Sequence, residues 1–507
     1  MIAVSRSRAL SWSVLMLTIV VGLSLRLAYL IRAAPWTDEF FTSLAIQMVA
    51  AKGLPILPSG LFYTHGLPHT YVGALVTRLF GFSLITARLP SLLISLPTLL
   101  LIYHVGQRWF NARVGFLATL LLTLSPEAIG WGGQARMYAM WQFLTLAAVY
   151  LLFEGLLRDR GTPARTWGLL ALSGAILCHV RTLLTIPALI LGLILAWWPA
   201  RRQKDFRLWR PRRVPWIEVL ALTVVLVSPL LFVVFERPSE IASSDQIQLS
   251  NWINPVRLFV DILIGAQQFV IFPYLVFTVL ALTGNLALLL RLIRRQADAH
   301  DPALLFLSVT GFVVLVEFSL ISPVFMRVPR YLFDILPLYL LVVARELDFL
   351  ATEVQNRVRG LVRTSAAILP VLLVVALFAR PVLEILNRQP SAMQQAYDYV
   401  RSHWQSGDRV ATALPAVAYV ALGRCDYFVA LEDPLLWPRN DDLVDPHLGL
   451  PWIGTEEGLR QAANEPSRLW IIVEKRYANP YPVIFGDQLI TAFQQLDAVV
   501  YLVEEEP

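Results

Sequence analysis

Apolar runs of about twenty residues recur along the chain, and they limit what it can fold into more than any other feature. A run of that length and composition is typical of a helix that crosses a bilayer. Hydrophobic residues make up 57% of the 507 residues and charged residues only 15%, so there is more apolar surface than a soluble core can bury. We therefore expect an integral membrane protein. The same composition excludes a disordered chain, a collagen-like repeat and a soluble nucleic-acid-binding protein.

The runs predict about eleven transmembrane helices. They cover residues 10–31, 89–104, 114–129, 138–157, 167–180, 183–198, 216–235, 268–290, 303–321, 331–343 and 365–378. Basic residues gather in alternate connections, most densely at 201–213, and basic short loops mark the cytoplasmic side. This register places the N-terminus in the cytoplasm. It places outside the first loop (32–88), the turns at 130–136, 179–181, 236–254 and 322–330, and the C-terminal tail.

Two domains are expected from this pattern. Residues 1–380 would form the transmembrane domain, with amphipathic helices at 40–51 and 70–80 along the membrane surface in the first loop. Residues 381–507 are predicted to form a small extracytoplasmic α/β domain, because short β-rich runs alternate there with helical stretches. The predicted strands lie at 410–420, 425–431, 469–473 and 498–504, and the predicted helices at 392–404 and 456–463. No glycine-rich phosphate motif opens a helix in this tail, so nucleotide binding has no support.

An acidic pair, Asp38-Glu39, follows the first span directly. One interpretation is a helix N-terminus, in which Thr37 caps the helix and the acids complement its dipole. The other is catalytic: one carboxylate acts as a general base toward an acceptor hydroxyl, while its neighbour binds a metal or the acceptor. The pattern alone leaves both open.

Basic and aromatic residues recur at the predicted external turns. They are Arg136 and Tyr138, His179 and Arg181, and Arg330 and Tyr331. Each arginine by itself can be explained as an anchor among the lipid headgroups. Several arginines outside, against the positive-inside trend, favour an anionic ligand instead. Phosphate is the natural candidate, because a guanidinium offers a fixed fork of donors to its oxygens.

Two histidines in the first loop, His65 and His69, are four residues apart. A metal pair on a helix uses this spacing, but Gly66 and Pro68 interrupt the helix that would align the two rings. A shared metal ion between them is therefore not expected.

Several motifs follow one another in a familiar order. They are the acidic pair; HGLPHTYVGALVTRLFGFSLITARLPSLL, which is similar to an HPPLYY stretch followed by LFG and ARLPS; GQRWFNARVGFLATLLLTLSP; QARMYAM; the turn at His179; and Pro329-Arg330-Tyr331 through Pro337. Together they resemble the GT-C superfamily of multi-pass glycosyltransferases, in the group of protein O-mannosyltransferases, aminoarabinose transferases and Rgt-type lipopolysaccharide-core transferases. The resemblance extends to about residue 345, and His65 matches the motif histidine.

Two departures from the family pattern concern its site. Gly66 replaces the first motif proline and the motif tyrosines become His69 and Thr70, so contacts to the acceptor are expected to differ. Gln134 stands where many relatives carry Glu, which removes a carboxylate that could hold a divalent metal. Glu127 is a substitute to consider. Whether a metal is required stays open, with Glu39 and His65 as candidate ligands.

The resemblance implies an inverting glycosyltransferase that takes a sugar from a polyprenyl-phosphate carrier on the outer face of the membrane. It implies Asp38 as the base, with Glu39 beside it. Donor and phosphate contacts would come from His65, Arg136, Tyr138, His179, Arg181, Arg330 and Tyr331. The acceptor would be a glycan, a lipid or a protein. Two other classes remain: a transporter or flippase for an anionic lipid, and a non-catalytic assembly protein.

Overall fold

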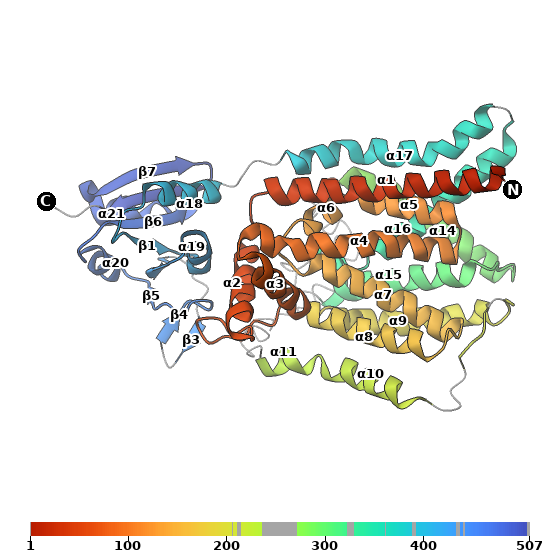
Figure 1. Cartoon of the computed structure of the whole chain (residues 1–507), viewed down its shortest axis with the longest axis horizontal. Coiled ribbons are helices and arrows are strands. Elements are labelled where there is room, and N and C mark those ends of the chain that lie inside the picture. The colour runs from red at the N-terminus through yellow and green to blue at the C-terminus, as the bar shows by residue number, and fades with distance from the viewer. Residues whose placement is uncertain are drawn as a thin grey trace. The chain divides into compact units, whose positions relative to one another are not determined.

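The computed structural model describes residues 2–204, 206–209, 214–235, 271–321, 329–359, 361–387, 392–431, 437–439 and 442–503 (Figure 1). The chain divides into two compact units. The first contains Met1–Ile31, Thr64–His69 and Arg88–Asn387, and the second contains Arg32–Tyr63, Thr70–Ala87 and Arg388–Pro507.

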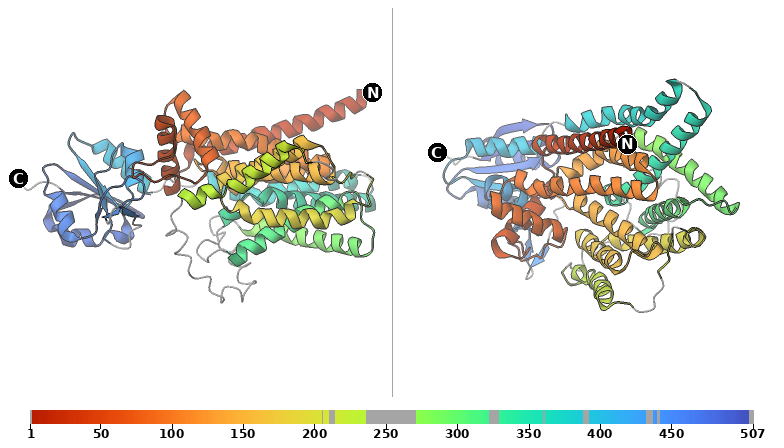
Figure 2. Two further views of the ribbon diagram at one scale, coloured as in Figure 1. Left: turned by 90° about the horizontal axis from the view of Figure 1, so that it is seen from below. Right: turned by 45° about the vertical axis from the view of Figure 1, so that its right-hand side comes forward.

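The first unit is a bundle of helices that run side by side (Figures 1 and 2). Its helices are α1 (Ile2–Arg32), α4 (Leu84–Trp109), α5 (Ala112–Leu124), α6 (Pro126–Gly132), α7 (Tyr138–Leu157), α8 (Thr162–Cys178), α9 (Thr182–Ala200), α10 (Trp216–Val227), α11 (Leu230–Phe235), α14 (Ile271–Ile293), α15 (Asp301–Ile321), the 3₁₀ turn η4 (Pro329–Leu332), α16 (Leu336–Arg357) and α17 (Leu361–Leu386). Helix α8 packs against α7 and α10, α9 against α15, and α16 against α5 and α17. Apolar side chains on the outer faces of α10 and α17 stay exposed, as expected for lipid contact.

The prediction of about eleven spans is not confirmed. In the described part of the chain, 8 helices are long and apolar enough to cross a membrane, or 9 if the bent pair α5 and α6 counts as one. Helix α8 has only 17 residues, and the span predicted at 331–343 is divided between η4 and α16, which continues past residue 343 through Arg345, Glu346 and Asp348. The predicted external turn at 236–254, and all but the end of the turn at 322–330, lie outside the described residues.

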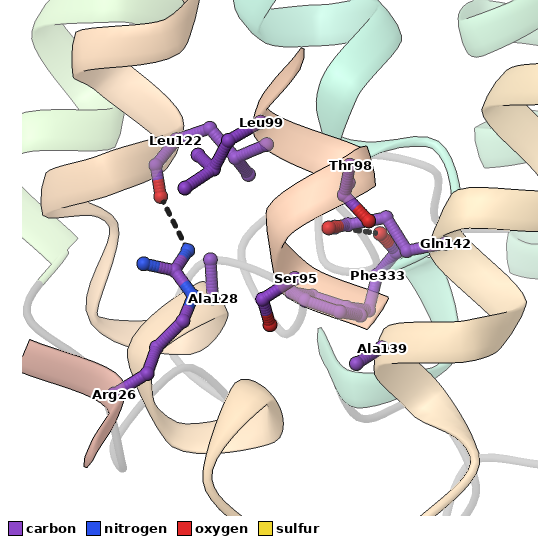
Figure 3. A pocket seen from close by; sticks show the side chains of 9 residues that line it. All are labelled: Arg26, Ser95, Thr98, Leu99, Leu122, Ala128, Ala139, Gln142 and Phe333. Carbon is purple, nitrogen blue, oxygen red and sulfur yellow. Dashed lines mark hydrogen bonds between the residues drawn. The ribbon is translucent and has the colours of Figure 1, made fainter. Parts of the chain in front are cut away.

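A sharp break separates α5 from α6, which meet at an angle of 66°. Ser125 caps α6 and Pro126 begins it, so the last carbonyls of α5 lose their helical partners. Arg26, buried on α1, donates to the carbonyl oxygens of Leu122 at 3.0 Å and Thr123 at 3.5 Å. Figure 3 shows this guanidinium beside a cavity of about 10 Å³, room for one water molecule. The same view shows Gln142, whose side-chain amide donates to the carbonyl of Phe333 at 2.9 Å. Arg26, which lies within an apolar span, thus stabilises the break between α5 and α6.

The second unit contains a mixed six-stranded sheet with the order β5-β2-β1-β6-β8-β7. Its strands are β1 (Arg409–Thr412), β2 (Tyr427–Val429), β5 (Trp452–Ile453), β6 (Leu469–Glu474), β7 (Leu489–Gln495) and β8 (Ala498–Val503). A separate hairpin pairs β3 (Trp437–Arg439) with β4 (Asp442–Val444). Side chains alternate along β6: Trp470 and Ile472 pack toward α18 (Ala392–His403) and α19 (Pro415–Leu422), whereas Leu469 and Ile471 pack toward α20 (Glu456–Ala463) and α21 (Pro480–Phe485).

The predicted small C-terminal α/β domain is confirmed, with errors of detail. Helices α18 and α20 match their predictions. The expected strand at 410–420 is wrong beyond Thr412, because Pro415 at the first helical position starts α19 instead. Strand β7 was missed, since its side chains are half-exposed and show no continuous apolar run.

Two helices of the first loop also contribute to the second unit, one of them only from Thr70 onward. They are α2 (Thr37–Lys52) and α3 (Leu67–Phe80), at the predicted amphipathic stretches. Leu44 and Ala45 of α2 are buried against Ala416 of α19. Phe41 stacks on His447 with ring centroids 3.9 Å apart. The C-terminal domain therefore holds the helix that begins with the acidic pair.

Candidate active site

Three chain segments of the first unit bring six predicted residues together. Arg136 and Tyr138 lie at the start of α7, His179 and Arg181 in the turn between α8 and α9, and Arg330 and Tyr331 in η4. We call Arg136, His179, Arg181 and Arg330 the arginine cluster. Its basic groups lie around the rings of Tyr138 and Tyr331.

His179 occupies the centre of this arrangement. Its ring stacks on Trp141 at 4.6 Å and meets the edge of Tyr331 at 5.4 Å. The backbone N–H of Arg181 donates to Nδ1 at 3.3 Å, which leaves Nε2 to carry the proton of the neutral ring. Burial lowers the pKa of His179 well below its ordinary value, and His65, Arg181, Arg136 and Arg330 lower it further. The electrostatic neighbours that act on His179 are thus all basic.

Tyr331 supports two of the arginines at once. The Arg181 guanidinium carbon lies 4.4 Å from its ring centroid, and that of Arg330 lies 4.9 Å away. Arg330 Nη2 also donates to the Tyr331 hydroxyl at 3.1 Å. Phe318 provides a second face for Arg181, at 5.0 Å. Such cation–π contacts orient the guanidinium groups of both arginines.

The backbone at Arg136 is fixed by a relay of hydrogen bonds from His69. Burial, with a further contribution from Arg136, lowers the pKa of His69 to about 3, so the ring is neutral at physiological pH. Ser91 Oγ donates to the Arg136 carbonyl at 3.0 Å, and therefore accepts from His69 Nε2 at 3.2 Å. His69 thus makes a structural contact that helps to fix the backbone at Arg136.

Gly66 explains one departure from the family motif. Its backbone φ of +74° is unfavourable for other residues, and an added Cβ would lie 2.5 Å from Cβ of Met137. The loop that carries the exposed His65 is therefore packed directly against Met137 of the QARMYAM motif.

The acidic pair begins α2 in the second unit. Trp36, not Thr37, occupies the N-cap position, so the expected Thr37 cap is wrong. Glu39 is fully buried and its Oε1 accepts from the Trp36 backbone N–H at 3.1 Å, as the third residue of a helix commonly does. Asp38 is half-buried. The structure thus gives Glu39 a capping contact and leaves the role of Asp38 to be tested.

A hydrogen bond fixes α2 to the loop that leads to His65. Thr42 Oγ1 and the Tyr63 hydroxyl are 2.9 Å apart, and Thr42 Oγ1 also donates to the Asp38 carbonyl at 3.2 Å. The chain passes from Tyr63 directly into Thr64 and His65. Helix α2 is therefore hydrogen-bonded to a residue that lies two positions before His65 in the chain.

The possible metal ligands are dispersed in the described residues, where no group of three or more His, Cys, Asp or Glu side chains gathers. Glu127 accepts hydrogen bonds from Ser125 and Tyr274 at the start of α6. Gln134 donates to the Tyr29 hydroxyl at 2.9 Å.

Sequence reasoning missed two residues that shape the site. Trp141 lies one helical turn after Met137, beneath the His179 ring, and its indole N–H donates to Thr182 at 2.7 Å. Nothing distinguished it from other aromatic residues of an apolar span. Arg26 did carry a signal, because a charged residue inside a membrane span is rarely without a specific partner.

Comparison with known proteins supports the resemblance. Residues 64–232 match the sequence profile of the dolichyl-phosphate-mannose-protein mannosyltransferase family. No curated protein matches the sequence at a significant level.

The solved structures that resemble this chain do so along most of its length. ArnT from Cupriavidus metallidurans, bound to undecaprenyl phosphate, is 14% identical with a TM-score of 0.63, over 96% of this chain and 97% of that one. The archaeal oligosaccharyltransferase AglB from Archaeoglobus fulgidus, in complex with an inhibitory peptide and a dolichol-phosphate, is 12% identical with a TM-score of 0.58, over 92% of this chain and 69% of that one. The chain therefore shares the fold of these two membrane proteins, and residues 64–232 resemble the mannosyltransferase family in sequence.

Proposed function

We propose that this protein transfers a sugar from a polyprenyl-phosphate carrier to an acceptor hydroxyl on the outer face of the membrane. The observation that carries the proposal is the arginine cluster, whose basic side chains lie together around the rings of Tyr138 and Tyr331. Like charges held together in a partly desolvated site repel one another. An anion that binds among them relieves this repulsion.

The ligand chemistry fits a phosphate on a lipid. Guanidinium groups bind phosphate oxygens through paired N–H donors, and helix starts add to the positive potential. The cluster lies at the ends of α7 and α9, two of the apolar helices long enough to cross the membrane. A polyprenyl chain can then stay in lipid while its phosphate reaches the cluster. The fold relatives contain undecaprenyl phosphate and dolichol-phosphate, which supports the same donor class here.

The proposed reaction is a single displacement with inversion. Asp38 takes the proton of the acceptor hydroxyl, and the resulting oxygen attacks the anomeric carbon opposite the phosphate. The bond between that carbon and the phosphate oxygen breaks. The polyprenyl phosphate leaves with the electron pair, and its growing negative charge is stabilised by the arginine cluster.

Glu39 is proposed to orient this end of α2 through its contact with the Trp36 N–H. If Glu39 instead holds a metal ion with His65, the Glu39→Gln variant should be as impaired as a variant of the base, and a chelator should abolish wild-type activity. If it only orients the helix, the loss should be mild and chelators without effect.

The test is turnover by purified protein in detergent or nanodiscs with a panel of polyprenyl-phosphate sugars and membrane-derived acceptors. We expect one donor to be consumed with release of polyprenyl phosphate and glycosylation of an acceptor. Movement of an anionic lipid across proteoliposomes without bond cleavage would replace the proposal with a transporter. Neither activity with any donor would contradict both.

A further inference from the structure

A second concentration of basic side chains lies at the other ends of the same helices. It surrounds a cavity of about 530 Å³, which we call the basic cavity. The residues that line it are Arg108, Trp109, Arg158, Lys204, Arg207, Ala299 and His300.

The basic cavity is separate from the arginine cluster. Helix α7 begins at Tyr138 in the cluster and ends at Leu157, immediately before Arg158 in the cavity. Its 20 residues span about 30 Å, the thickness of the hydrocarbon part of a bilayer. Helix α9 likewise begins after Arg181 and ends before Lys204. The two sites therefore face opposite sides of the membrane.

The walls of the basic cavity are fixed by specific contacts. The Trp109 indole N–H donates to Glu154 at 3.0 Å, and its carbonyl accepts from His300 Nδ1 at 2.8 Å. Gln203 Nε2 donates to the carbonyl of Ala297 at 2.9 Å. Phe206 is buried beneath the Arg158 guanidinium, 5.0 Å from its ring centroid. These bonds join the ends of α4 and α7 to the connections that follow α9 and α14.

Among the described residues of these walls, positive charge exceeds negative charge. Glu154 is nearly fully buried and serves three arginines: Arg158 at 2.9 Å, Arg160 at 3.4 Å and Arg108 at 3.6 Å. One carboxylate cannot neutralise all three. Lys204 and Arg207 add two further charges to the lining.

The acids of the neighbouring α14–α15 connection are engaged elsewhere. Asp301 pairs with Arg291 at 2.6 Å, and Asp298 accepts from the backbone N–H groups of His300 and Asp301. A cavity with this excess of positive charge attracts an anion that can accept several hydrogen bonds.

The helix end that precedes Lys204 of the basic cavity has the features of a membrane interface. Trp197 and Trp198, at the end of α9, are both exposed, and Arg201 and Arg202 lie over their rings at 5.1 and 4.6 Å. Exposed tryptophan beside arginine at the end of an apolar helix marks the membrane interface. Basic pockets between such helix ends suit the phosphate of an anionic lipid.

We propose that the basic cavity binds the phosphate headgroup of an anionic phospholipid in the leaflet opposite the arginine cluster. The same phosphate chemistry could come from a soluble phosphate ester, so the test compares both sources. This inference does not depend on the proposed transferase reaction.

The experiment measures binding of dioctanoyl phosphatidylglycerol to the full-length protein in detergent, by native mass spectrometry and by thermal stabilisation. The test variant is Lys204→Ala/Arg207→Ala. The control, Arg294→Ala/Arg295→Ala, removes the same charge from exposed arginines of this end that do not line the cavity. We expect the test variant to bind about tenfold more weakly or worse, the effect of losing one charge-assisted hydrogen bond, and the control to bind within about threefold of wild type.

Three results would overturn the proposal. Equal weakening in both variants would mean that surface charge alone attracts the lipid. Equal affinity for dioctanoyl phosphatidylcholine would remove the preference for an anionic headgroup. Equal affinity for glycerol 3-phosphate would reassign the basic cavity to a soluble phosphate ester. Should the double variant fail to fold, the single variant Arg207→Gln, judged against Arg294→Gln, gives the same discrimination.

Discussion

Replacing Tyr331 in two steps measures how much the aromatic support of the arginine cluster contributes to donor binding. Tyr331→Phe keeps the ring and removes only the hydroxyl that accepts from Arg330 at 3.1 Å. Tyr331→Leu also removes the ring face that lies 4.4 Å from the Arg181 guanidinium and 4.9 Å from that of Arg330.

The expected magnitudes follow from these contacts. A hydrogen bond to a charged group contributes about 1.5 kcal/mol at a half-exposed position, so Tyr331→Phe should weaken donor binding about tenfold. Each cation–π contact contributes about 1 kcal/mol, so Tyr331→Leu should lose about 2 kcal/mol more and weaken binding a few hundred-fold in total. These are upper values, because relaxed arginines regain contacts with water.

The assay is titration of undecaprenyl phosphate, which carries the same phosphate and lipid chain as the proposed donor class, into detergent-purified protein, with melting temperatures recorded in parallel. Tyr150→Leu is the matched control: this tyrosine also has ring contacts and a hydrogen bond, to His104 at 2.8 Å, but lies toward the far end of α7. It should leave donor affinity unchanged. If folded Tyr331→Leu protein binds the donor within twofold of wild type, Tyr331 does not organise a phosphate site.

Three further results are expected. Gly115→Val should lower the melting temperature by an amount equivalent to about 1 to 3 kcal/mol, because any Cβ at this position would lie 2.5 Å from the backbone of α4. Burial alone would raise the pKa of Asp408, but hydrogen bonds from Arg468 and its neighbours hold that pKa below the ordinary value. Asp408→Asn should therefore reduce stability at neutral pH, and the difference from wild type should shrink below about pH 4 as the wild-type carboxylate is protonated. In a background without native cysteines, Gln296→Cys should resist an impermeant thiol reagent on intact cells and Leu496→Cys should react; the reverse pattern would contradict the predicted topology.

The sequence predicts the membrane bundle and the C-terminal domain because both rest on local patterns of apolar residues. The sequence misplaces spans where a proline breaks a helix or where charged residues follow an apolar run. Pro126 breaks a run that looks continuous, and the charged residues of α16 follow an apolar start without interruption. Burial of Arg26 against α5 is a tertiary contact that periodicity does not encode.

The candidate site shows the same division. Arg136, His179 and Arg330 were each identified from motifs that fall at different turns, and their grouping depends on how three helix ends meet. That meeting also depends on Trp141 and on the relay from His69 through Ser91, neither of which has a sequence signature. Candidate binding residues can thus be identified from the sequence, whereas the residues that hold them in place are identified only from the structure.

The central claim, a transferase with a carboxylate base, is tested most directly by the single-turnover rate of Asp38→Asn. The substitution keeps the shape of the side chain at the start of α2, so insertion, melting temperature and donor affinity should match wild type. We expect the rate of sugar transfer to fall by about 10² to 10⁴, the usual contribution of a positioned general base. A rate near that of wild type, with the same donor bound, would show that Asp38 only belongs to a helix start and that the base must be sought elsewhere.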